Sequence, residues 1–134
     1  MSDSDVITRL LHAVDRLDWA AVRDCFTDVV ATDYTSLWGG EPGDQRADAL
    51  IAQWQEFTAT LSATQHVTGP IVFADGRAET HVIAYHWLLD GGDLWVVHGH
   101  YVARIDDGRI AALTLQTISS YGHEGLPSIG PRRP

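Results

Sequence analysis

Apolar and polar residues in the first part of the chain alternate with the period of a helix. Six apolar residues recur three or four positions apart and predict an amphipathic helix over residues 4–16: Val6, Ile7, Leu10, Leu11, Val14 and Leu17. Asp18 then stands where an N-cap would start a second, short helix, whose apolar side is Trp19, Val22 and Phe26. A third helix is predicted over residues 46–61, with an apolar stripe made of Leu50, Ile51, Trp54, Phe57 and Leu61.

The remaining segments have the pattern of strands and turns. Residues 29–38 are rich in β-branched and aromatic side chains and predict a strand, and the glycines and proline of residues 39–44 predict a loop. Pro70 suits an edge position or a bulge. Turn sequences of the types Ala-Asp-Gly, Asp-Gly-Gly-Asp and Asp-Asp-Gly separate four further predicted strands, at residues 64–74, 77–89, 94–105 and 109–120.

Helices and strands are therefore segregated along the chain, which predicts one α+β domain over residues 1–122. We expect a curved, mostly antiparallel sheet with about three N-terminal helices on one face. The remaining residues, 123–134, are rich in glycine and proline and predict a poorly ordered tail.

The predicted strand at residues 77–89 is apolar on both of its sides. A sheet with one face in water alternates more cleanly, so something should cover the second face. The chain has few elements left for this, and a second subunit is the economical expectation. On one side of the strand lie Ala78, Val82, Ala84 and Leu88, and on the other Ile83, Tyr85 and Trp87.

Composition narrows the classes of function. The 134 residues suit one domain, and the net charge of −9 argues against nucleic acid or an anionic membrane as a partner, because phosphate contacts need clustered Lys and Arg. The single cysteine, Cys25, excludes an intrachain disulfide. The N-terminus has no signal-peptide pattern and no apolar run reaches the roughly 18 residues of a membrane span, so a cytoplasmic protein is the default expectation.

Several of the seven histidines are candidates for chemistry. His98 and His100 point to the same side of their predicted strand and could bind a metal, or could line a pocket or the core. No carboxylate lies between His100 and Asp106 to complete a metal-binding motif, so we expect no metal.

Three further residues mean little when taken singly. Asp15 continues the helical row of Ile7 and Leu11 at the margin of the buried stripe, where periodicity alone favours a solvated carboxylate at the end of the helix. Tyr34 and His66, each within a predicted strand, are more often structural than catalytic.

The order of several short motifs changes this interpretation. The motifs are V-D-R-L-D-W (14–19), T-D-Y-T-S (32–36), T-Q-H (64–66), A-Y-H (84–86) and H-G-H-Y-V-A-R-I-D-D-G (98–108). Together they resemble scytalone dehydratase and its relatives, the SnoaL-like group of the nuclear-transport-factor-2-like superfamily. The resemblance extends over residues 4–122 and implies a cone-shaped sheet wrapped by helices around an apolar pocket.

The resemblance also implies roles for individual residues. Asp15 matches an aspartate that orientates a catalytic histidine, His66 matches that histidine, and Tyr34 matches one of two tyrosines that hold a water on the substrate carbonyl. Val14 stands where the other tyrosine would be. His98 matches a substrate-contacting asparagine.

The family's second catalytic histidine would fall near residues 91–93, where this chain has none, so His86 or His98 would have to take its place. Trp38 and Trp54 are candidates for the pocket lining, or for plain core. Trp87 and Trp95 share the side-chain parity of the face assigned to a partner subunit.

These observations favour a cofactor-free lyase or isomerase, a dehydratase or cyclase that removes a proton next to the carbonyl of a small apolar or polycyclic secondary metabolite. The alternatives are an aldol-type polyketide cyclase and a non-catalytic module that binds small apolar molecules. By resemblance we expect a homo-oligomer, with a trimer slightly favoured over a dimer.

Overall fold

The computed structural model describes residues 3–89 and 93–130 and has the predicted α+β fold. Most of the expected turn at residues 90–93 and the last four residues of the expected tail lie outside the described residues. In chain order the elements are a 3₁₀ turn at Asp3–Asp5, α1 (Val6–Asp15), α2 (Trp19–Asp24), β1 (Phe26–Asp33), α3 (Thr35–Trp38), β2 (Gly43–Arg46), α4 (Ala47–Thr58), β3 (Leu61–Thr68), β4 (Val72–Ala74), β5 (Arg77–Leu88), β6 (Leu94–Asp106) and β7 (Arg109–Tyr121).

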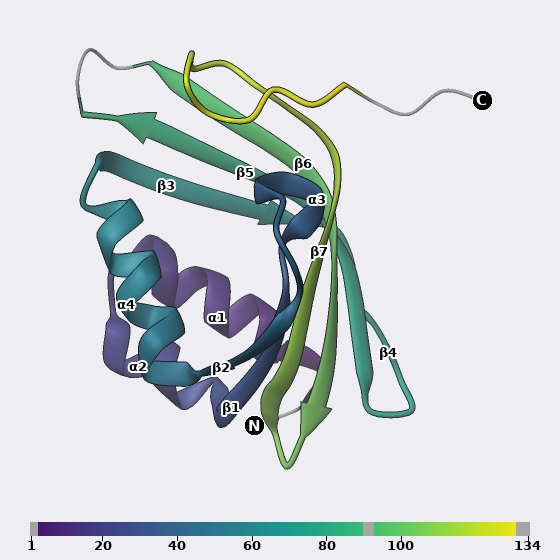
Figure 1. The fold of residues 1–134 in the computed structure, drawn as a ribbon. Coiled ribbons are helices and arrows are strands. Elements are labelled where there is room, and N and C mark those ends of the chain that lie inside the picture. The colour runs from purple at the N-terminus through teal and green to yellow at the C-terminus, as the bar shows by residue number, and fades with distance from the viewer. Residues whose placement is uncertain (1–2, 90–92, 131–134) are drawn as a thin grey trace.

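The strands form one mixed sheet, with the order β2-β1-β7-β6-β5-β3 and with β4 paired to the first three residues of β5. All neighbouring strands are antiparallel except β1 and β7, which run parallel, with Thr32 opposite Leu113. The predicted meander of four strands in the second half of the chain is therefore present. The sheet curves strongly, and α1, α2 and α4 lie together on its inner, concave side (Figure 1).

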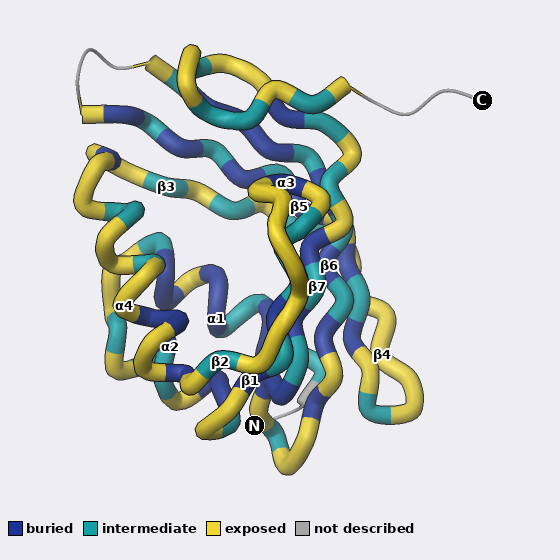
Figure 2. Tube along the Cα trace, in the orientation of Figure 1, coloured by how far each residue is buried: buried dark blue, intermediate teal, exposed yellow. Residues whose placement is uncertain are grey.

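The amphipathic pattern determines which helix faces are buried. The apolar residues of α1 are buried, whereas its polar residues are intermediate or exposed (Figure 2). The core continues along the concave sides of β5, β6 and β7. Among the described residues, no helix is long and apolar enough to cross a membrane.

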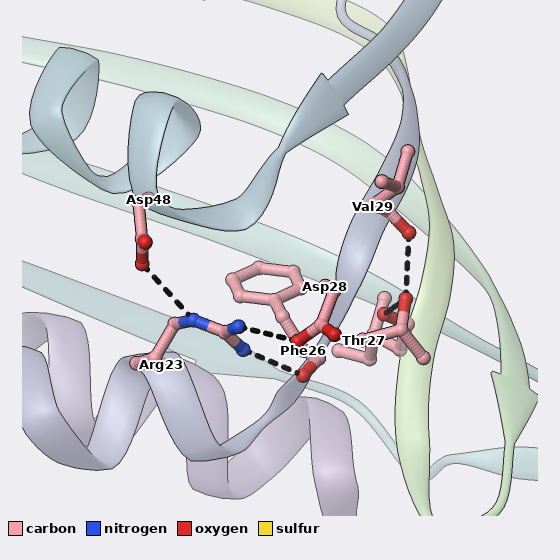
Figure 3. A network of polar contacts seen from close by, with 7 residues as sticks. Arg23, Phe26, Thr27, Asp28, Val29 and Asp48 are labelled. Atoms are coloured by element: carbon pink, nitrogen blue, oxygen red, sulfur yellow. Dashed lines mark hydrogen bonds and ion pairs between the residues drawn. The ribbon is translucent and has the colours of Figure 1, made fainter.

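Arg23, in the last turn of α2, joins three elements (Figure 3). Its guanidinium donates to the carboxylate of Asp48 in α4 at 3.1 Å, to the carboxylate of Asp28 in β1 at 2.7 Å and to the carbonyl oxygen of Phe26 at 3.1 Å. The predicted N-cap of the same helix is also present, since the Asp18 carboxylate accepts from the backbone N–H of Ala21 at 3.2 Å. These contacts fix the short helix at both of its ends.

The predicted strand at residues 29–38 is wrong at both ends. The strand starts earlier, at Phe26, which the pattern had placed on the second helix, and it stops at Asp33. The Asp33 carboxylate accepts from the backbone N–H of Thr35 at 3.0 Å and from its hydroxyl at 2.7 Å. This local turn outweighs the strand propensity and starts the short helix α3.

The predicted loop at residues 39–44 is partly a strand. β2 pairs antiparallel with β1, and the Thr32 hydroxyl donates to the Gly43 carbonyl oxygen at 3.3 Å and accepts from the Gln45 amide at 2.9 Å. The glycine-rich sequence has little strand propensity, so the pairing with β1 decides the conformation.

The predicted strand at residues 64–74 is two strands. Pro70 has no N–H to donate, and the ladder with β5 stops at Thr68 and resumes at Val72. The Thr80 hydroxyl donates to the Gly69 carbonyl oxygen at 2.9 Å and so binds the chain at the break.

The segment after β7 packs against the rest of the fold as far as the structure describes it. Ile129 forms a β-bridge with Ser120. The carbonyl oxygen of Pro127 accepts from the buried Ser120 hydroxyl at 2.7 Å and from the Trp95 indole N–H at 3.0 Å. Apolar contacts of Leu126 and Ile129 with the core add to these bonds.

We therefore predict that Ser120→Ala destabilises the fold by about 1–3 kcal/mol, because it removes a buried hydroxyl that holds the C-terminal segment. The measurement is urea unfolding followed by tryptophan fluorescence. Ser119→Ala is the matched control, since no side-chain hydrogen bond of Ser119 occurs within the described chain; we expect it to change stability by less than about 0.5 kcal/mol. Equal unfolding midpoints for the two variants would contradict the role of Ser120.

Candidate active site

A cavity of about 500 Å³ lies between the concave face of the sheet and the helices. This volume is typical of sites for small molecules. Side chains of α1, α3 and α4 line one side, and side chains of β3, β5, β6 and β7 the other. Much of the lining is apolar, including Leu11, Val14, Leu50, Val82, Val97 and Leu115.

Asp15 and His66 are in direct contact at the edge of this cavity. One carboxylate oxygen of Asp15, Oδ1, lies 2.7 Å from His66 Nδ1 and accepts from the Thr64 hydroxyl at 2.8 Å. The other, Oδ2, accepts from the backbone N–H of His66 at 2.8 Å. Asp15 is the last residue of α1, and Thr64 and His66 lie on β3 with their side chains on the same face, so the helix end supplies one acceptor group for three donors of the strand.

Asp15 is held in its ionised form by this arrangement. Burial acts to raise the pKa of the carboxyl, but the hydrogen bonds and the charge of His66, with the bond from Thr64, outweigh it. The pKa of Asp15 is therefore below its ordinary value. Because a carboxylate can only accept, His66 carries a proton on Nδ1, and its Nε2 has no partner among the described residues.

Tyr34 and Tyr101 place two hydroxyl groups together in the cavity lining. Their oxygens are 3.1 Å apart and their rings meet edge to face. Burial is the largest influence on the pKa of both hydroxyls. It raises the pKa of Tyr101, and it raises the pKa of Tyr34 well above its ordinary value. Both hydroxyls are therefore protonated at neutral pH. Tyr34 lies at the start of α3 rather than within a strand as predicted.

Tyr101 is a residue that the sequence reasoning missed. It lies on β6, its side chain is buried, and the Asp15 carboxylate also acts to raise its pKa. The sequence does indicate the direction of this side chain. Trp95, Val97 and Tyr101 are separated by even numbers of residues, so in a strand their side chains point to the same face.

His86 is the second histidine of the cavity and differs chemically from His66. It is buried on β5, and its Nδ1 lies 3.0 Å from the carbonyl oxygen of Trp95. Burial lowers the pKa of His86 to about 4, so the ring is neutral at neutral pH. The rings of His66 and His86 are 6.2 Å apart, centre to centre, at 80°.

Trp38 and Trp54 line the cavity, as the sequence reasoning proposed. Trp95 also lines it and is 1 % exposed, so its assignment to the outer face was wrong. Its indole packs against Trp38, Phe57 and His86, with ring centres 4.7–6.0 Å apart, and forms one aromatic wall with them.

His98 does not line the cavity, so the expected substrate contact is absent. Its neighbours Val97 and Gly99 are buried, whereas His98 points to the outer, convex face, where its Nε2 lies 3.2 Å from the Tyr121 hydroxyl. His100 points to the same face and contacts His81 and Glu79. Side chains alternate between the two faces of the sheet along β6, so His98 and His100 point outward because Trp95 points inward.

Gln45 is a further lining residue that the sequence did not indicate. Its Oε1 is buried without a hydrogen-bond partner in the described parts of the chain, while its amide nitrogen donates to Thr32. A buried acceptor without a hydrogen bond lowers the stability of the fold unless a ligand or a water molecule donates a hydrogen bond to it.

The model of the SnoaL-like domain family matches residues 4–109, so the chain belongs to that family. Solved structures with the same fold include the Kfla4162 protein of Kribbella flavida, with 24 % identity, a TM-score of 0.76, and 91 % of this chain and 90 % of that one covered. A putative scytalone dehydratase from Novosphingobium aromaticivorans has 15 % identity, a TM-score of 0.74, and coverage of 96 % and 90 %. IdmH, a putative polyketide cyclase from Streptomyces antibioticus, has 20 % identity, a TM-score of 0.71, and coverage of 87 % and 92 %. No curated protein sequence matches the chain.

The lowered pKa of Asp15 predicts how stability changes in acid. Above the ordinary carboxyl pKa both the folded and the unfolded chain carry an ionised Asp15, and its contribution to stability is complete. As the pH falls below about 4, the unfolded chain takes up the proton first and the contribution is lost. We expect the difference in unfolding free energy between the wild type and Asp15→Asn to shrink as the pH falls from about 5 to below about 4.

Urea unfolding at a series of pH values measures this difference. Asp24→Asn is the control, because Asp24 is exposed and makes no hydrogen bond within the described residues. A difference for Asp15→Asn that persists unchanged to about pH 2.5 would contradict the prediction.

Proposed function

We propose that the protein is a cofactor-free acid–base enzyme that removes a proton next to the carbonyl group of a small apolar or polycyclic ketone. The observation that carries this proposal is the Asp15–His66 pair. Its imidazole has one nitrogen bound by a carboxylate and the other without a partner among the described residues, beside a largely apolar cavity that also contains two protonated tyrosines.

His66 acts as the base in this proposal. Asp15 fixes the Nδ1–H tautomer, leaves the lone pair on Nε2 and stabilises the imidazolium that forms. In the reaction the C–H bond breaks, the proton moves to Nε2, and the electron pair moves to the carbonyl oxygen as an enolate. The apolar surroundings strengthen these electrostatic effects, because they exclude water.

Tyr34 and Tyr101 stabilise the enolate oxygen. The two hydroxyls have two hydrogens, and the bond between them uses one, so the other remains for an oxygen of the ligand. A hydrogen bond aimed at the developing charge is worth most in the transition state.

The enolate has three possible fates that balance in atoms and charge. Where the enolate is conjugated with a carbon–carbon double bond, the imidazolium can return its proton at the far carbon of the conjugated system, which is isomerisation. The enolate can expel a β-hydroxyl group, which takes up the proton and leaves as water. It can also attack a second carbonyl within the molecule, and the new alkoxide then takes up the proton. The relatives described as a putative dehydratase and a putative polyketide cyclase support this range of reactions.

The first test needs no knowledge of the natural substrate. The proton next to the carbonyl of 2-tetralone, a bicyclic ketone, is exchanged for deuterium in D₂O, and proton NMR follows the loss of its signal. We expect the protein to accelerate exchange by about 10²–10⁴ over buffer, and His66→Ala to remove this acceleration. His98→Ala is the matched control on the outer face and should exchange like the wild type. Binding of 2-tetralone without faster exchange would contradict the proposal and favour a binding module.

The tyrosine pair generates a second prediction. Either hydroxyl can replace the other in part, so Tyr34→Phe and Tyr101→Phe should each slow the exchange less than the double variant does. The double variant should lose about 10²–10³ in rate, the usual effect of removing an oxyanion donor. Circular dichroism checks that the phenylalanine rings preserve the fold. Exchange in the double variant within twofold of the wild type would show that the hydroxyls do not act on the enolate.

A further inference from the structure

His86 is a buried imidazole of the cavity for which the base mechanism has no use. It belongs to the aromatic wall of the cavity, where its ring contacts Phe57 and Trp95, and it is 7 % exposed. The base is a different ring, His66, and the hydroxyl pair lies on other elements. A buried polar ring in a ligand cavity calls for a function of its own.

One hydrogen bond determines the protonation of this ring. The partner of His86 Nδ1 is the backbone carbonyl oxygen of Trp95, at 3.0 Å, across the β5–β6 ladder. A carbonyl oxygen can only accept, so Nδ1 carries the hydrogen. The neutral ring therefore presents a bare lone pair at Nε2, which has no partner in the described chain.

The two histidines of the cavity thus differ in the partner of Nδ1. His66 Nδ1 is bound by a carboxylate, whereas His86 Nδ1 is bound by a neutral carbonyl and its ring is buried beside Trp95. The groups that influence the charge of His86 are the Trp95 carbonyl, His66 and Asp15. His86 therefore accepts a hydrogen bond and does not supply a proton.

We propose that His86 is the specificity-determining acceptor of the site and selects ketones that carry a hydroxyl group close to His86, whose ring centre lies 6.2 Å from that of the base His66. The proposal rests on the proposed function for the position of the reacting carbon beside His66. The hydroxyl donates its hydrogen to His86 Nε2 and receives none from it. His86 therefore holds this hydroxyl in place and does not help it to leave as water, so the substrate class is a hydroxylated bicyclic or polycyclic ketone that keeps this group in the product.

The test compares the binding of 2-tetralone with that of its 5-, 6-, 7- and 8-hydroxy derivatives. One hydrogen bond to a buried acceptor corresponds to an affinity gain of about 3–10-fold. We expect at least one hydroxylated ketone to bind the wild type more tightly than 2-tetralone by this factor. The gain should vanish in His86→Phe, which retains an aromatic ring, and return in part in His86→Gln, which restores an acceptor. His98→Phe is the control and should retain the whole gain.

A second measurement does not depend on a variant that folds. Long-range ¹H–¹⁵N spectra distinguish a protonated ring nitrogen from a bare one. We expect His86 Nε2 to be bare from about pH 8 to pH 5, and its signal to move when the favoured hydroxylated ketone is added but much less with 2-tetralone.

Three results would overturn the proposal: no hydroxylated ketone binds more tightly than 2-tetralone, the gain survives in His86→Phe, or Nε2 carries a proton at neutral pH. Failure of the proposed function has a different signature, because it removes the exchange of 2-tetralone and leaves the binding gain unchanged. The two ideas can therefore fail separately.

Discussion

The carboxylate of Asp15 is the group on which both the architecture and the chemistry of the cavity depend. It ends α1 and binds β3 through the backbone N–H of His66, the ring of the same residue and the Thr64 hydroxyl. β3 is an outermost strand of the sheet, so it has a strand partner on only one side, and α1 supports it from within the curve. One side chain therefore determines the tautomer of His66 and joins the helix to the strand at the edge of the cavity.

The fold was predictable wherever a single pattern dominated. Helical periodicity predicts α1 and α4, and the turn sequences between the strands predict β5, β6 and β7 within one residue at each end. The prediction fails between Phe26 and Arg46, where local and distant contacts compete. The Asp33 turn ends a strand that β-branched residues would continue, and β2 forms because β1 provides a partner, which propensity does not reveal.

The site was predictable where a motif carried it and not where it depended on which face of a strand points inward. The resemblance brings Asp15 and His66 together, but it places His98 in the pocket, although that ring lies on the convex face. Assigning Trp95 to the outer face conceals Tyr101, which shares its parity. The protonation of His86 depends on a backbone carbonyl of the neighbouring strand, and no side-chain pattern contains that information.

The parallel pairing of β1 with β7 has a consequence for how the chain folds. Phe26 lies opposite Ile110, so the sheet closes only after nearly all of the polypeptide is available. Such distant pairings make folding slow, because a long loop must be ordered before its contacts form. During synthesis the N-terminal helices leave the ribosome well before the strands that cover them, with their apolar sides in water. The cavity is thus among the last features to assemble, and the emerging chain passes through a stage at which chaperones can bind it.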